Sequence, residues 1–259
     1  MKNLWSRLFG KKVGNEPFGF KLISEQHAES KTVTHIIEGE ATTFCYAGFQ
    51  NLKANSKYDR FFAGQLILPT GFVVCTDPLM AAVALPQSWR VEPGEYPVYL
   101  YIAIEGDEVG RVCYAELAFR DAVPDFWELS LISDKLLKEA FDRKMNGMYP
   151  VDAGLSCFAD LDTFRLHKRA MEEFEQRNKD GNFYTDVLEA YFEANANTPE
   201  SSRGQDWANY KPAMAAGNVI MFGSGWGDGY YPRYVGYNSK GNVVKMVTEF
   251  IAEEGGGIL

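Results

Sequence analysis

The sequence contains only three histidines and four cysteines, which limits the metal and redox chemistry that it can carry. The cysteines Cys45, Cys75, Cys113 and Cys157 are far apart, so no C-x-x-C pair is available for a zinc site or a redox dithiol. Three of them sit in strand-like apolar runs, and we expect buried, free thiols. We expect neither a metal site nor a cofactor.

The chain also lacks long apolar runs and an excess of basic residues. No run approaches the roughly 20 apolar residues that a membrane-spanning helix needs, so we expect no stable membrane insertion. The N-terminus has no apolar core of a secretion signal, which favours a cytoplasmic protein. With 26 Lys and Arg against 35 Asp and Glu, the formal net charge is -9. This charge disfavours nucleic acid as a ligand and is compatible with a basic protein partner.

The remaining composition fits a globular protein. The 259 residues are 46% hydrophobic and 14% aromatic, enough for one large core without disulfide or metal support. We divide the chain into a short basic and apolar leader over residues 1–16 and a single α+β domain over residues 17–259. The sequence does not indicate an oligomeric state.

Short segments rich in β-branched and aromatic residues, separated by turn residues, predict strands over much of the chain. The clearest are Thr32–Ile37, Thr42–Tyr46, Phe72–Thr76, Tyr96–Ile104, Arg111–Phe119, Asn218–Phe222, Arg233–Tyr237 and Val243–Phe250. Turn residues at Glu105-Gly106-Asp107 predict that the strands on either side of them form a hairpin.

About three helices are predicted between residues 133 and 195. Ser133 is a candidate N-cap for the first, which Gly147 would end, and Asp160 is a candidate N-cap for the second. The third covers Tyr184–Ala194, where apolar residues recur at helical spacing. Strands, inserted helices and closing strands together predict an α+β fold. Its sheet would be mainly antiparallel, and either sandwich-like or strongly bent.

The most unusual segment is Gly223-Ser224-Gly225-Trp226-Gly227-Asp228-Gly229, with glycine at alternate positions. Glycine permits positive φ and a close approach of another backbone or a ligand. The spacing fits neither a dinucleotide fingerprint, a phosphate loop nor a nucleophile elbow. Two interpretations stay open: a structural turn with Trp226 as a packing anchor, or a binding loop. The candidate ligand-binding or partner-binding residues are Ser224, Trp226, Asp228 and Tyr230.

A group of carboxylates precedes and enters the second predicted helix. Asp152, Asp160 and Asp162 lie close together in the sequence, and carboxylates that meet in space can carry out acid-base or metal-assisted chemistry. The spacing does not match a calcium loop, and helix capping explains part of the group. The catalytic candidates are Asp152, Asp160 and Asp228, if they converge beside the glycine-rich segment.

Several motifs together resemble the bacterial family catalogued as domain of unknown function 4241. They are Gly71 with Thr76-Asp77-Pro78, Pro93-Gly94-Glu95-Tyr96-Pro97-Val98, Val151-Asp152-Ala153-Gly154 with Asp160, the segment from Gly223 through Tyr230 to Gly236, and Val247-Thr248-Glu249-Phe250. The resemblance covers about Gly71 to Phe250, with departures at Val235 and Glu249. It implies a bacterial domain without an established activity. Because family members occur among secreted toxins and their antidotes, it also implies a toxin-neutralising immunity protein as one function.

Two functions follow as expectations. The first is a non-enzymatic protein-binding domain of bacterial origin, with an immunity protein that neutralises a basic toxin as its specific form. The missing catalytic signature, the acidic charge and the abundant aromatic residues favour it. The alternative is a hydrolase that uses an Asp152, Asp160 and Asp228 cluster beside the glycine-rich segment.

Overall fold

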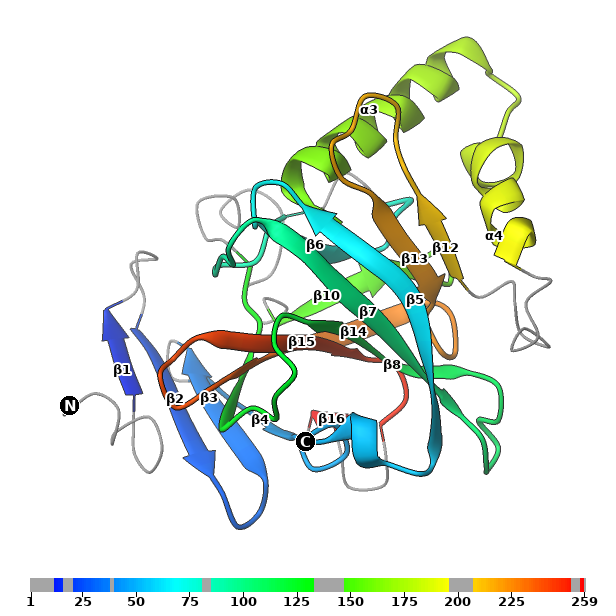
Figure 1. The fold of residues 1–259 in the computed structure, drawn as a ribbon. Helices are drawn as coiled ribbons and strands as arrows, with labels where there is room; N and C mark the ends of the chain where they lie inside the picture. The colour runs from blue at the N-terminus through cyan, green and yellow to red at the C-terminus, as the bar shows by residue number, and fades with distance from the viewer. Residues whose placement is uncertain are drawn as a thin grey trace.

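The computed structural model of the chain describes residues 12–15, 21–37, 40–80, 85–132, 147–195, 207–252 and 257–258. Every strand pairing between named strands in these residues is antiparallel. The strands form three sheets, and two α-helices lie at the edge of the molecule, beside the smallest sheet (Figure 1). The prediction of a mainly antiparallel β fold is therefore confirmed.

We call the three sheets the N-terminal sheet, the central sheet and the small sheet. The N-terminal sheet has the order β1-β2-β3-β4-β16, with β1 (Lys12–Asn15), β2 (Lys21–His27), β3 (Thr32–Ile37), β4 (Glu40–Cys45) and β16 (Gly257–Ile258). The central sheet has the order β10-β14-β15-β8-β7-β5, and β9 also pairs with β14. The strands of the central sheet are β5 (Tyr58–Leu68), β7 (Gly94–Ala103), β8 (Val112–Ala118), β9 (Phe126–Leu129), β10 (Met148–Val151), β14 (Gly229–Tyr237) and β15 (Val243–Glu249). The small sheet has the order β12-β13-β11-β6, with β6 (Val73–Thr76), β11 (Leu155–Asp160), β12 (Trp207–Tyr210) and β13 (Val219–Gly223).

The helices differ from the prediction in number. Helix α3 (Leu161–Arg177) begins after Asp160, as predicted, and the Asp160 carboxylate accepts the backbone N–H of Asp162. The third predicted helix is a π-helical turn over Tyr184–Leu188 that continues into α4 (Glu189–Asn195). The first, from Ser133, lies outside the described residues. The part of the chain that is described thus contains two α-helices rather than three, together with a 3-10 turn, η1 (Leu52–Ala54).

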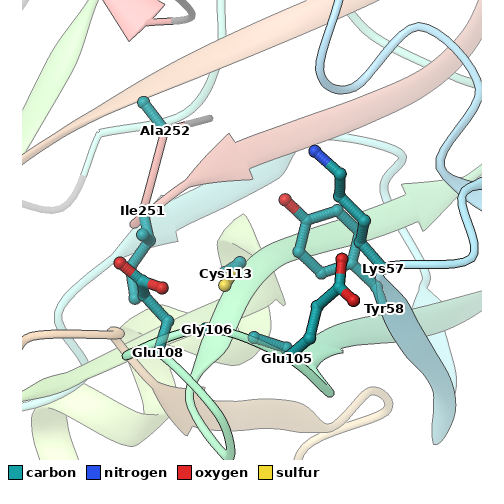
Figure 2. Close-up of a pocket in the computed structure, with 9 residues that line it drawn as sticks. Lys57, Tyr58, Glu105, Gly106, Glu108, Cys113, Ile251 and Ala252 are labelled. Atoms are coloured by element: carbon teal, nitrogen blue, oxygen red, sulfur yellow. The ribbon is translucent and has the colours of Figure 1, made fainter. Parts of the chain in front are cut away.

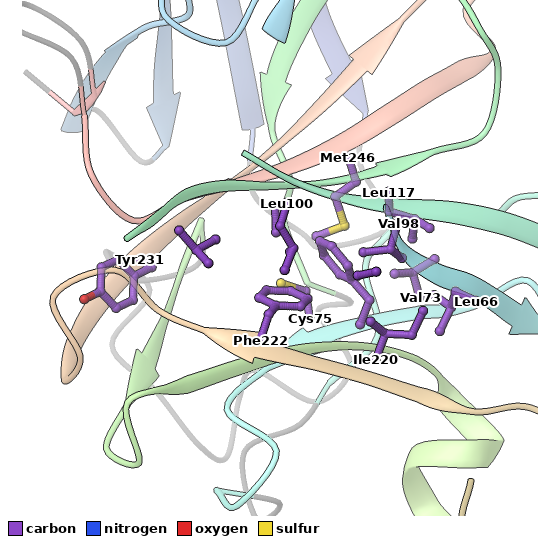
Figure 3. Packing of buried hydrophobic residues seen from close by; sticks show 14 of the residues in the cluster. Leu66, Val73, Cys75, Val98, Leu100, Leu117, Ile220, Phe222, Tyr231 and Met246 are labelled. Carbon is purple, nitrogen blue, oxygen red and sulfur yellow. The ribbon is translucent and has the colours of Figure 1, made fainter. Parts of the chain in front are cut away.

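Alternating residues of the strands enter different cores on the two faces of a sheet. In β11, Phe158 packs in the core between the small and central sheets, whereas Cys157 and Ala159 pack in the core beneath α3. In β13, Phe222 enters the first of these cores and Met221 the second. Figure 3 shows residues of the first core, which joins the two sheets through interdigitated side chains.

The other face of the central sheet forms an aromatic core with the N-terminal sheet. Phe44 of β4 lies in this core, its ring centroid 4.7 Å from that of Tyr234 in β14. Phe49 stacks on Tyr234 at 4.4 Å and meets Trp127 edge-on at 4.9 Å. Aromatic pairs in these geometries add stability beyond the area that they bury. The high aromatic content of the sequence is thus used largely inside the protein.

The predicted strands are present, and β7 and β8 form the predicted hairpin. All four cysteines are free and buried, as predicted. Burial raises the pKa of Cys75 to about 11, so this thiol stays protonated at neutral pH. Residues 12–15 of the predicted leader form β1, and residues 1–11 lie outside the described part of the chain. Among the described helices, none has the length and apolar character required to cross a membrane.

Candidate functional site

Three turns that are distant in the sequence meet at one end of the small sheet. Asp77, which follows β6 and is fully buried, accepts the backbone N–H groups of Asp152 and Ala153 at 2.9 Å each. Its second carboxylate oxygen accepts the N–H of Leu79 at 2.7 Å. Three backbone N–H donors thus converge on one buried carboxylate, which satisfies its hydrogen-bonding capacity inside the protein. Asp77 therefore fixes the turn between β10 and β11.

The glycine-rich turn is attached to this turn by further hydrogen bonds. Asp228 accepts the N–H of Gly154 at 3.2 Å, and the N–H of Ser224 donates to the Gly154 carbonyl at 3.1 Å. The Ser224 hydroxyl donates to the Gly227 carbonyl at 2.9 Å, and the Tyr231 hydroxyl donates to the same carbonyl at 2.8 Å. Ser224 is buried, so this predicted binding residue holds the turn together instead of facing solvent.

Two glycines of the turn are required for different reasons. Gly225 has φ +61°, and a Cβ atom there would lie 2.8 Å from Cβ of Phe250 and 3.2 Å from the Val112 carbonyl oxygen. Gly227 has φ +99°, but a Cβ atom there would meet nothing within 4 Å. Gly225 thus allows the turn to approach the central sheet closely, whereas Gly227 only allows the backbone conformation.

Trp226 is exposed, which favours the interpretation of the segment as a binding loop over that of a turn with Trp226 as a packing anchor. Its exposed fraction is 56%, and that of Tyr230 is 54%. The Arg111 guanidinium lies 4.0 Å from the Trp226 ring centroid and donates to the Gly225 carbonyl at 3.0 Å. Tyr230 belongs to β14, where it pairs with Pro150. We call the exposed side chains of Trp226, Arg111 and Tyr230 the Trp226 surface.

A cavity of about 650 Å³ adjoins this surface. Ile251 lines the cavity and also packs against Gly225, so the cavity and the turn share a wall. Figure 2 shows the carboxylates of Glu105 and Glu108 on opposite sides of the Cys113 thiol. The volume lies within the range of small-ligand pockets, roughly 300–1,000 Å³. Lys57 is the cation among the described lining residues, so carboxylates outnumber cations there.

The structure does not bring the three catalytic candidates together. The turn at Asp152 lies beside Asp228, and both residues are exposed. Asp160 is at the other end of β11, which is about 16 Å long at roughly 3.3 Å per residue. It is fully buried, and its oxygens accept hydrogen bonds from Asp162 and from both the N–H and the hydroxyl of Thr70. Asp160 thus has a capping role.

Within the described residues, no group of three or more His, Cys, Asp or Glu side chains is arranged to hold a metal ion. The three-turn assembly also has a buried support from α3. His167 of α3 contacts the carbonyl of Pro78 through Nε2 at 2.8 Å and is fully buried among aromatic rings. Burial lowers the pKa of His167 to about 4, so the ring is neutral and donates to Pro78. The sequence contains a signal for the burial of His167, because its spacing from Phe164 and Met171 places all three residues on one face of the helix.

Comparison with known proteins adds one match. The family model described as "Protein of unknown function (DUF4241)" matches residues 66–248, well over half of the chain. No curated protein and no solved structure matches the chain. The matched region contains the three turns that meet at Asp77, Gly154 and Asp228. The chain therefore belongs to the DUF4241 family of proteins of unknown function.

Proposed function

We propose that this chain is a non-enzymatic binding protein whose protein partner docks on the Trp226 surface. Trp, Tyr and Arg are the residues most enriched among those that dominate binding energy in protein interfaces. Trp226, Tyr230 and Arg111 provide one of each: Arg111, just before β8, stacks on Trp226 in the turn, and Tyr230 follows the turn at the start of β14.

The observation that carries the proposal is an exposed tryptophan on a turn that cannot rearrange easily. The Trp226 side chain is 56% exposed, yet the turn that carries it is held by Ser224, Asp228 and Arg111 through hydrogen bonds. A binding residue that is already ordered costs little conformational entropy when the complex forms. The turn thus prepares Trp226 for contact with a partner.

Charge favours a basic partner. The chain has a formal net charge of -9, and Glu105 and Glu108 line the cavity beside the Trp226 surface. A partner that packs an apolar residue on Trp226 would bring its Lys or Arg side chains near these carboxylates. Complementary charge raises the association rate and selects among partners.

In its specific form, the proposal is a cytoplasmic bacterial immunity protein that neutralises a basic toxin by covering the toxin's functional surface. The arrangement of the carboxylates does not favour the alternative function, a hydrolase. Its three carboxylates would have to line one pocket, whereas Asp160 lies at the far end of β11 from Asp152 and Asp228.

The proposal is tested by expressing the chain together with the toxins encoded beside its gene, and scoring both survival and complex formation. We expect protection against one of them, lost in Trp226→Ala and in Arg111→Ala. Met214→Ala serves as the matched control, because Met214 is an apolar side chain that is 98% exposed. It lies before the start of β13, whereas the glycine-rich turn follows the end of that strand. If no toxin in the set is bound or neutralised, the immunity form of the proposal is wrong.

A further inference from the structure

A second cavity, of about 340 Å³, opens on the central sheet. It is lined by Tyr96 near the start of β7 and by Ala118 at the end of β8. The Trp226 surface is attached at the other end of β8, where Gly225 packs on Val112. Ala118 lies six positions along β8 from Val112, which corresponds to about 20 Å. The two sites are therefore distinct.

The floor of this cavity holds a buried ion pair. Lys245 of β15 donates to Glu116 of β8 at 2.8 Å, and their side chains are 8% and 2% exposed. Burial and the nearby Glu116 carboxylate raise the pKa of the Tyr101 hydroxyl. Replacing a buried ion pair with apolar residues is often neutral or stabilising, so stability alone is a weak reason for this pair. Charged groups retained at the floor of a cavity are candidates for a functional role.

Arg60 of β5 adds a cation that is held in place and still has free donors. Its guanidinium lies 3.4 Å from the centroid of the Tyr99 ring, and its Nε donates to the Tyr101 hydroxyl at 3.2 Å. Within the described residues, no carboxylate forms an ion pair with Arg60, and its two Nη groups make no hydrogen bond. Both Nη groups of this guanidinium are thus available to a ligand.

The charge at this cavity has the opposite sign to that of the whole chain. Four cations line it, Lys53, Arg60, Arg120 and Lys245, against three carboxylates, Glu95, Glu116 and Asp121, so the formal charge of the lining is +1. Lys53 and Asp121 pair with each other at the surface, and Lys245 pairs with Glu116. In a chain of net charge -9, a local positive excess directs anions to this cavity.

We propose that the cavity binds the phosphate or carboxylate group of a small organic ligand through Arg60. The planar guanidinium, stacked on Tyr99, matches either anion with two parallel N–H donors. Tyr96 and Phe119, whose rings meet edge-on at 5.0 Å, line the same cavity and contact the apolar part of the ligand. This site goes beyond the proposed protein-binding function and does not depend on it.

The test uses three probes of similar shape: phenyl phosphate, benzoate and uncharged phenol. Their affinities are measured by titration calorimetry, and the side-chain Nε–H signal of Arg60 is followed by NMR, with Arg60→Lys used to assign it. We expect at least one anion to bind more tightly than phenol and to shift the Arg60 signal. Which of the two anions binds identifies the chemical group.

Arg60→Gln should weaken this binding by about tenfold or more, because it removes charge-assisted hydrogen bonds. The matched control is Arg169→Gln, an exposed arginine of α3 that pairs with Glu173, and it should leave the affinity unchanged. The proposal is overturned if neither anion binds more tightly than phenol. It is also overturned if Arg60→Gln keeps the wild-type affinity, or if both variants weaken binding equally.

Discussion

Replacing Gly225 with alanine tests whether the glycine-rich turn needs glycine for close packing. At Gly225 a new Cβ atom would lie 2.8 Å from Cβ of Phe250 and 3.0 Å from Cγ1 of Ile251. At Gly227, two residues away, a new Cβ atom meets nothing within 4 Å, although φ is also positive. Gly227→Ala is therefore a control that changes the backbone preference without creating a clash.

The magnitudes follow from these two environments. An alanine held at positive φ costs about 1–2 kcal/mol. In both variants, alanine also restricts the unfolded chain, which returns about 0.4–1 kcal/mol. We therefore expect Gly227→Ala to lower the free energy of unfolding by about 1 kcal/mol. Gly225→Ala adds the cost of forcing extra volume into a packed contact, about 1–3 kcal/mol, which gives a total loss of about 3 kcal/mol.

Urea unfolding followed by far-UV circular dichroism measures both losses from the transition midpoint, provided that the slope m is unchanged. The reasoning is refuted if the two variants lose the same stability. Equal losses would mean that the backbone conformation alone requires glycine, and that the contact of Gly225 with Phe250 adds nothing.

Three further predictions concern buried polar groups. Asp160→Ala should lower the free energy of unfolding by about 3 kcal/mol, because it removes the α3 cap and leaves the N–H of Thr70 without its acceptor. The control Asp162→Ala, at an exposed residue, should cost less. Equal urea midpoints for the two variants would contradict the capping role. His167 has a pKa of about 4 in the folded state and near 6.5 in the unfolded state, so only the unfolded state gains a proton as the pH falls between these values. From pH 7 to pH 5 this should lower the free energy of unfolding by about 2 kcal/mol. A His167→Gln variant whose stability has the same pH dependence would disprove the prediction. Lys245→Met should lower the free energy of unfolding by about 3–5 kcal/mol, because Glu116 stays buried without its partner. Lys53→Met breaks an exposed pair and should cost under about 1 kcal/mol. Thermal denaturation compares the stabilities of the two variants.

The sequence predicted those elements whose local pattern matches their structure. Asp160 before an amphipathic segment predicted the start of α3, and turn residues around Gly106 predicted the β7–β8 hairpin. Strand β11 was missed because residues from Leu155 to Asp160 are buried on both faces, so that no alternation of polar and apolar residues marks them. Strand β5 was not singled out because a register shift beside Gly64 interrupts its alternation.

The candidate site was predicted only in part, because its assembly depends on tertiary contacts. The glycine spacing identified the turn, but the contact of Gly225 with Phe250 sets its position on the central sheet. The choice between a packing anchor and an exposed binding residue for Trp226 depended on Arg111, which is over a hundred residues away in the sequence. Asp160 was grouped with Asp152 by sequence distance, although an entire strand separates them in space.

The most direct test of the proposed function is the dissociation constant between the chain and a partner found by co-expression, measured for Trp226→Ala and for Met214→Ala. A residue that dominates an interface costs at least about 2 kcal/mol when truncated, so we expect Trp226→Ala to weaken binding by about 30-fold or more. Met214→Ala should bind as the wild type does. Wild-type affinity in Trp226→Ala would contradict the assignment of the Trp226 surface as the partner-binding site.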